Sequence, residues 1–209
     1  MKIGINIAGL SHNDLGNGMH TYKDGHENLF KNLINPLKEN NDIKIYLYTY
    51  DTSETNNILE IYKPTRYTTL ELRNNNSSDL AANTYINSLE KLRDEDIDFI
   101  ITTRFDLDIR CNIDIDFKKF NFLFKELKNW DEANLTSDTL YAFPKYMLED
   151  VIMSLRETWL GKNTYFCPGL FHCLYKFLVK RIDESNIQFI DDEESTIQIS
   201  NKFRIGKFK

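Results

Sequence analysis

The stretch that decides the fold is Asp98-Phe-Ile-Ile-Thr-Thr-Arg-Phe-Asp-Leu-Asp108. Its first half combines two isoleucines, a phenylalanine and two threonines, a composition typical of a strand that is buried on both faces. This strand runs directly into an Asp-x-Asp pair, Asp106 and Asp108. If the extended backbone continues, alternate residues point to one side, so both carboxylates can converge on one cation. Hard divalent cations such as Mg²⁺ and Mn²⁺ take oxygen ligands of this kind.

Other acidic pairs of the same spacing occur in this chain, at residues 94–96, 96–98 and 114–116. They flank helices or loops, and we interpret them as solvated charge. A lone Asp-x-Asp is common in acidic proteins, so the pattern by itself is only a hypothesis. The 106/108 pair is favoured because it follows the fourth strand of an alternating series, where open α/β sheets bind their ligands.

The elements of that series are read from the spacing of apolar residues. Strand patterns cover residues 2–10, 42–50, 68–72 and 98–103, and helical patterns cover 22–36, 57–62 and 79–92. This order predicts right-handed crossovers and a mostly parallel sheet. Further along, the pattern predicts strands at 120–124 and 139–143, helices at 144–159 and 170–180, and a hairpin of 187–190 with 196–199. We therefore predict one α/β domain over residues 1–209, with a mostly parallel central sheet flanked by helices and mixed strands in its second half.

The bulk composition excludes several classes of protein. The chain has 209 residues, of which 41% are hydrophobic, and this is enough for one globular core. A net charge of −6 argues against a nucleic-acid partner, which calls for a basic face. No signal peptide and no run of about 18 apolar residues is present, so we expect a soluble cytoplasmic protein without a transmembrane segment. Three cysteines without CxxC spacing predict free thiols.

The segment Ile100-Ile-Thr-Thr-Arg-Phe-Asp-Leu-Asp108 resembles the strand and Asp-x-Asp motif of GT-A-fold nucleotide-sugar glycosyltransferases. Residues 2–10, 22–36 and 45–50 fit the same plan. The chain looks most similar to the small GT-A domains with which chlorella viruses and other large DNA viruses of algae glycosylate capsid protein. The resemblance implies a GT-A-like (Rossmann-like) domain, in which residues 1–110 bind the nucleotide sugar and residues 111–209 bind the acceptor. It also implies a place in the host-cell cytoplasm, and leaves open whether the domain was cut from a longer polypeptide.

The family's binding positions can be carried over to the ends of the first two strands. Ala8, Gly9 and Leu10 would hold the nucleotide base and ribose, largely through backbone groups. Tyr50 and Asp51 would occupy another position in contact with the base or ribose.

Further positions lie around the motif strand. Arg73 would lie beside the base or diphosphate, and Asp79 would contact hydroxyl groups of the donor sugar. Asp106 would contact the ribose, or the metal through water, while Asp108 would be the direct metal ligand. Arg104 is a candidate for ligand contact, and the competing interpretation is that it pairs with nearby carboxylates.

The second half would supply the acceptor side. His172 is the only histidine there, and it would be a further metal ligand; the alternative is a histidine hydrogen-bonded to the backbone at a helix start. Inverting transfer needs a base on the acceptor hydroxyl, for which we choose Asp138, with Asp131 and Glu132 as rivals. Trp130 would stack on the acceptor sugar, unless it belongs to the core.

The predicted function is transfer of a hexose or deoxyhexose from a UDP-sugar to a glycan or glycoprotein acceptor, with Mn²⁺ or Mg²⁺ as cofactor. A metal-dependent nucleotidyltransferase is the first alternative. It normally has a Gly-rich segment with a basic residue soon after the first strand, whereas Gly9 is followed by Leu-Ser-His-Asn. The second alternative is a non-catalytic module that binds nucleotide sugars without turnover.

Overall fold

The computed structural model describes residues 1–12, 21–71, 78–109, 112–125, 134–160, 171–191 and 197–199. Within these residues one seven-stranded sheet has the order β3-β2-β1-β4-β7-β6-β8. Its strands are β1 (Lys2–Ala8), β2 (Asp42–Tyr50), β3 (Arg66–Leu70), β4 (Phe99–Thr103), β6 (Phe120–Phe124), β7 (Leu140–Pro144) and β8 (Ile187–Asp191). β7 is antiparallel to both of its neighbours, β4 and β6, and the remaining pairs are parallel. The predicted α/β class with a mostly parallel, partly mixed sheet is confirmed.

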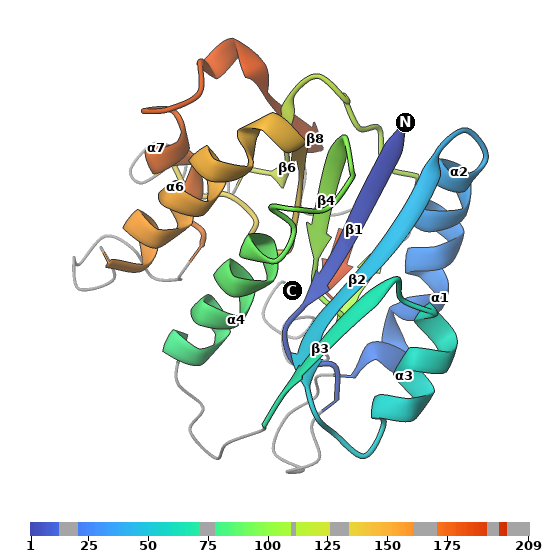
Figure 1. The fold of residues 1–209 in the computed structure, drawn as a ribbon. Helices are drawn as coiled ribbons and strands as arrows, with labels where there is room; N and C mark the ends of the chain where they lie inside the picture. The colour runs from blue at the N-terminus through green and yellow to red at the C-terminus, as the bar shows by residue number, and fades with distance from the viewer. Residues whose placement is uncertain are drawn as a thin grey trace, which may run out of the picture.

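Helices cover both faces of this sheet (Figure 1). One face carries α1 (His26–Leu29), the π-helical turn η2 (Phe30–Ile34), α2 (Asn35–Lys38) and α3 (Thr55–Tyr62); the other carries α4 (Ser78–Glu90), α6 (Leu148–Leu160) and α7 (Leu174–Leu178). Short 3-10 turns lie at Tyr22–Asp24, Lys145–Met147 and Glu184–Asn186. The single helix predicted at 22–36 is interrupted by the π turn. Pro36 lacks the amide hydrogen that an α-helix needs at that position, which is consistent with this irregularity.

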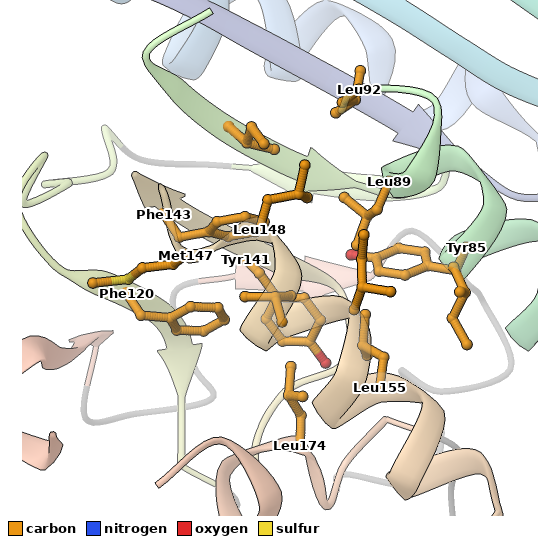
Figure 2. Packing of buried hydrophobic residues seen from close by; sticks show 14 of the residues in the cluster. Tyr85, Leu89, Leu92, Phe120, Tyr141, Phe143, Met147, Leu148, Leu155 and Leu174 are labelled. Carbon is orange, nitrogen blue, oxygen red and sulfur yellow. The ribbon is translucent and has the colours of Figure 1, made fainter. Parts of the chain in front are cut away.

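The sheet separates two apolar clusters because alternate strand residues point to opposite faces. In β1, Ile3, Ile5 and Ile7 pack toward α1 and α3, while Ala8 packs toward α4. Figure 2 shows the cluster on the face covered by α4, α6 and α7, in which side chains from these helices and from β6 and β7 interdigitate. Two of the tyrosines of this cluster, Tyr85 and Tyr141, carry polar hydroxyl groups into an otherwise apolar region.

Two of the predicted elements are wrong in detail. The predicted terminal hairpin does not form: β8 instead extends the sheet beside β6, and β9 (Ile197–Ile199) pairs antiparallel with β5 (Leu107–Ile109). Residues 187–190 and 196–199 have strand-like composition, but that composition does not specify a partner. The helix predicted at 170–180 is shorter, because Phe171–Cys173 form a turn before α7.

The prediction of free thiols is wrong for Cys173, which is disulfide-bonded. The other two cysteines, Cys111 and Cys167, lie outside the described residues. Among the helices that the structure describes, none is long and apolar enough to cross a membrane.

Candidate functional site

The carboxyl ends of three parallel strands meet at one edge of the sheet. Gly9, Asp51 and Arg104 follow β1, β2 and β4 there, and the register brings these strand ends side by side. The amide of Gly9 donates to the carbonyl of Tyr48 at 3.0 Å, which carries the β1–β2 ladder one residue further. Because β7 is antiparallel, its amino end lies at the same edge, with Leu140 opposite Thr103. The topology therefore gathers residues from both halves of the chain.

The backbone does not stay extended through the Asp-x-Asp motif. β4 ends at Thr103, the chain turns at Phe105 and Asp106, and β5 begins at Leu107 in a separate two-stranded sheet. The condition under which both carboxylates would point to one side, a continuous extended backbone, is therefore not met.

Each carboxylate of the motif has a different partner. The guanidinium of Arg104 donates from Nε to Oδ1 of Asp106 at 2.8 Å and from Nη2 to Oδ2 at 2.7 Å. Asn28 on α1 donates from Nδ2 to Oδ1 of Asp108 at 2.6 Å. Asp106 and Asp108 are 2% and 6% exposed, so these contacts compensate for the loss of hydration. The competing interpretation of Arg104, as a partner to a nearby carboxylate, is confirmed.

The helix after β1 positions Asp108. Asn32 donates to the carbonyl of Ile109 at 2.5 Å, one turn beyond the Asn28 contact. At Gly25 the chain passes so close to Leu107 that a Cβ would collide with the Leu107 carbonyl. Sequence reasoning missed these residues, although the spacing of Asn28 and Asn32 places both on one helical face.

Asp138, the predicted base, lies across from Arg104. Its Oδ2 is 4.0 Å from Nη1 of Arg104, an ion-pair distance too long for a hydrogen bond. Burial lowers the pKa of the Arg104 guanidinium, whereas the negative charges of Asp106 and Asp138 raise it. The second effect is the larger in sum, so the pKa of Arg104 lies above its ordinary value. Arg104 therefore remains a cation between two carboxylates.

His172 lies beside Asp138, which it contacts through its second ring nitrogen. Nδ1 of His172 is 3.1 Å from the carbonyl oxygen of Thr136, and the amide of Thr136 donates to the His172 carbonyl at 2.8 Å. A carbonyl only accepts, so this contact assigns the hydrogen to Nδ1. Nε2 then faces Oδ2 of Asp138 at 3.4 Å. The predicted alternative for His172, a hydrogen bond to the backbone, is present in the structure.

Tyr85 reaches the same region from α4. The residue is 4% exposed, and within the described part of the chain its hydroxyl has no hydrogen-bond partner. Burial raises the pKa of Tyr85; nearby Thr102 lowers it, although no hydrogen bond of normal geometry joins the two hydroxyls. The negative charge of Asp138 also raises the pKa of the Tyr85 hydroxyl, and the positive charge of Arg104 lowers it. The helical pattern predicted at 79–92 includes Tyr85 but gives it no functional role.

The residues predicted to bind the nucleotide lie at the expected strand ends, but with different exposure. The side chains of Ala8 and Tyr50 are buried, and the Tyr50 hydroxyl is 2.5 Å from Oγ1 of Thr84. Gly9 has a φ of +114°, and no atom lies within 4 Å of a Cβ built there, while Leu10 is half-buried. A ligand at Ala8 or Gly9 would therefore meet backbone groups.

Asp51 is exposed, and it accepts a hydrogen bond from Thr55 at 3.0 Å. The remaining predicted site residues are not described by the structure. Arg73 and Trp130 lie outside the described residues, as do the rival bases Asp131 and Glu132. Asp79 is the second residue of α4, but its side chain is outside the described part.

The oxygen donors of the motif have the chemistry that Mg²⁺ and Mn²⁺ prefer. Both oxygens of Asp106 accept a hydrogen bond from Arg104, which uses two of the about four lone-pair sites of the carboxylate. Over the described ranges there is no group of three or more His, Cys, Asp or Glu placed to hold a metal ion. A cation here would be held by Asp108 with ligands from substrate or water.

A scan against protein-family models found no matching family, and a search of curated proteins found no similar protein. The fold and the geometry of this edge therefore carry the functional argument.

Proposed function

We propose that this chain is a metal-dependent glycosyltransferase, which transfers a hexose or deoxyhexose from a UDP-sugar to a sugar acceptor. The observation that carries the proposal is the grouping at one sheet edge of Asp106 and Asp108 after β4 with Asp138 before β7. Ligands of open α/β sheets bind at this edge. A viral capsid glycoprotein as acceptor follows from the sequence resemblance alone.

The proposed donor lies along the ends of β1 and β2, where backbone at Gly9 and the exposed Asp51 offer hydrogen bonds to base and ribose. Asp108 would hold Mn²⁺ or Mg²⁺, which neutralises charge on the departing diphosphate. Asp106 is held by Arg104, and the proposal gives it a contact to ribose or to metal-bound water. Asp138 would accept the proton of the acceptor hydroxyl.

Thermal unfolding with UDP-, GDP- and dTDP-sugars, each with and without Mn²⁺, tests this proposal. A ligand that binds the native state alone raises its stability. We expect an increase that needs both Mn²⁺ and a UDP-sugar and is absent in Asp108→Asn. Asp116→Asn is a matched control, because Asp116 belongs to another acidic pair and caps the backbone at Lys118.

The products distinguish the competing functions. Release of UDP supports the proposal, whereas release of pyrophosphate from a nucleoside triphosphate would assign a nucleotidyltransferase. Binding of UDP-sugars without hydrolysis or transfer would assign a binding module. No stabilisation by any nucleotide sugar would reject all three.

A further inference from the structure

Helix α6 carries a row of exposed apolar side chains. Five large apolar side chains are exposed among the described residues, and three of them lie on this helix or on the 3-10 turn that leads into it. They are Tyr146, Met153 and Leu160, which are 74%, 43% and 73% exposed. Single exposed apolar residues are common on protein surfaces, whereas several gathered on one face are typical of an interaction surface.

The spacing places these three side chains on one face of α6. They follow one another at intervals of seven residues, close to two helical turns, so each is displaced by only about 20° around the axis from the one before. The row is therefore about 20 Å long. The opposite face of α6, which includes Leu148 and Leu155, packs into the apolar cluster of Figure 2. One side of α6 thus belongs to the core, and the other presents apolar groups to the solvent.

The exposed face is symmetric about Met153. Apolar residues lie seven positions before and seven positions after it, while Asp150 lies three positions before it and Arg156 three positions after it. In a two-fold dimer, any contact between residue i and residue j is repeated between residue j and residue i. Two antiparallel α6 helices that meet at Met153 therefore place Asp150 of each copy opposite Arg156 of the other. In the same arrangement Tyr146 lies opposite Leu160.

Asp150 and Arg156 are able to form this contact. Asp150 has no ion pair among the described residues, so its carboxylate can accept from a guanidinium of a second copy. Arg156 binds Glu90 through Nη2, and the other nitrogens of its guanidinium are further donors. The charges on the two halves of the face are therefore complementary to each other.

The same arrangement brings Glu149 of one copy opposite Glu157 of the other, but both carboxylates already have a cation. Arg93 donates to Glu149 at 2.7 and 2.9 Å. Arg181 donates to Glu157. Each glutamate thus approaches the other as part of an ion pair, which removes most of the repulsion between like charges.

We propose that this face of α6 is the contact surface of a homodimer, in which a second copy of the chain packs antiparallel about Met153. The second copy is the occupant because the apolar spacing is symmetric and the charge changes sign about the centre, and a partner of unrelated sequence requires neither. Each copy contributes three apolar and two charged side chains. An interface of this size belongs to the small, transient class, so we expect dissociation in the micromolar range. Dimerisation of this kind does not depend on the transferase function.

Sedimentation velocity of the whole chain measures the association, between about 1 and 500 µM to span a micromolar dissociation constant. We expect monomers at the lowest concentration and dimers at the highest. Met153→Glu places two carboxylates at the centre of the contact and should weaken association at least about tenfold. Tyr67→Glu is the matched control, because Tyr67 is an exposed apolar residue on β3, and it should leave association unchanged. Thermal unfolding checks that each variant is folded.

Charge reversal tests the direction of the two helices. Asp150→Arg and Arg156→Asp each place like charges opposite one another, so each should weaken association. The double variant restores opposite charges and should recover most of the lost affinity. In a parallel pair Asp150 would face Asp150 of the second copy, and the double variant would recover nothing.

Three results would contradict this dimer. A chain that stays monomeric up to about 500 µM, well above a micromolar dissociation constant, would overturn the proposal and leave the row to a different partner. Association that is as strong in Met153→Glu as in the wild type would place the interface on another face and overturn it too. Weakening by both single charge reversals without recovery in the double variant would overturn the antiparallel arrangement.

Discussion

Arg104 and Asp106 form a bidentate ion pair across a single intervening residue, with N–O distances of 2.8 and 2.7 Å. The residue between them, Phe105, is buried and packs edge-on against Tyr62 with ring centroids 5.8 Å apart. The turn after β4 is thus held by an ion pair on one side and by aromatic packing on the other. This turn gives Asp106 and Asp108 different surroundings.

Replacing Arg104 with Met should leave the Asp106 carboxylate buried without its cation. Loss of one partner of a buried pair costs about 3 kcal/mol or more, and we expect the lower figure because the Arg104 side chain is 24% exposed. Urea unfolding measures the loss. Arg104→Lys keeps the charge but not the two-pronged geometry, and should recover part of it. Equal stability of the Met variant and the wild type would contradict the pairing.

Asn28→Leu should release Asp108 from its hydrogen bond without removing the carboxylate. Groups that orient a metal ligand typically contribute about 10- to 100-fold to metal affinity, so the Mn²⁺ concentration giving half-maximal stabilisation by a UDP-sugar should rise. Titration by thermal shift measures it. Asn41→Leu is the control, because Asn41 donates to the Leu37 carbonyl in α2. An unchanged Mn²⁺ dependence in Asn28→Leu would remove Asn28 from this role.

Gly9→Ala should destabilise the end of β1 through backbone strain alone. The φ of +114° is one that L side chains rarely adopt, yet the space around the added methyl group is open. The expected cost is about 1–3 kcal/mol, measured by urea unfolding. A neutral substitution would mean that the strand end relaxes to a negative φ at little cost.

Glu54 should contribute to stability in a pH-dependent way. Hydrogen bonds from Asn57, Lys23 and Tyr22 lower the pKa of Glu54 to about 2. A lowered carboxyl pKa stabilises the fold above the ordinary value of 4.5, and this contribution is lost as pH falls toward about 2. The difference in Tm between wild type and Glu54→Gln should therefore be constant above pH 5 and shrink progressively below 4.5. A difference that persists unchanged at pH 2 would contradict this linkage.

Much of the first half could be predicted from sequence because its signals are local. The isoleucines of β1 and the apolar run of β4 indicate buried strands, and the helical spacing between them requires parallel crossovers. The same reasoning failed for the last strands, where short apolar segments have several possible partners. Pairing of β9 with β5 joins residues 197–199 to residues 107–109, a choice that no local pattern encodes.

The same difference between local signals and long-range contacts applies to the residues of the candidate site. Composition and strand position singled out Asp106 and Asp108 as polar residues after a strand, and the family resemblance added Asp138. Tyr85 was missed because an aromatic residue on the inner face of a helix has the pattern of core packing, and its hydroxyl leaves no trace in that pattern. Asn28 was missed because its partner lies 80 residues away along the chain.

The sequence by itself determined that Phe99–Thr103 is a buried strand and that acidic side chains follow it at a sheet edge, because strand propensity and burial depend on neighbouring residues. The tertiary structure alone decided the partners of the other two carboxylates. Asp108 turns to Asn28 and Asp138 to His172, whereas the contact of Asp106 with Arg104 is local. The physical reason is that a buried charge takes the partner that packing brings within hydrogen-bond distance, and packing joins segments far apart in the chain.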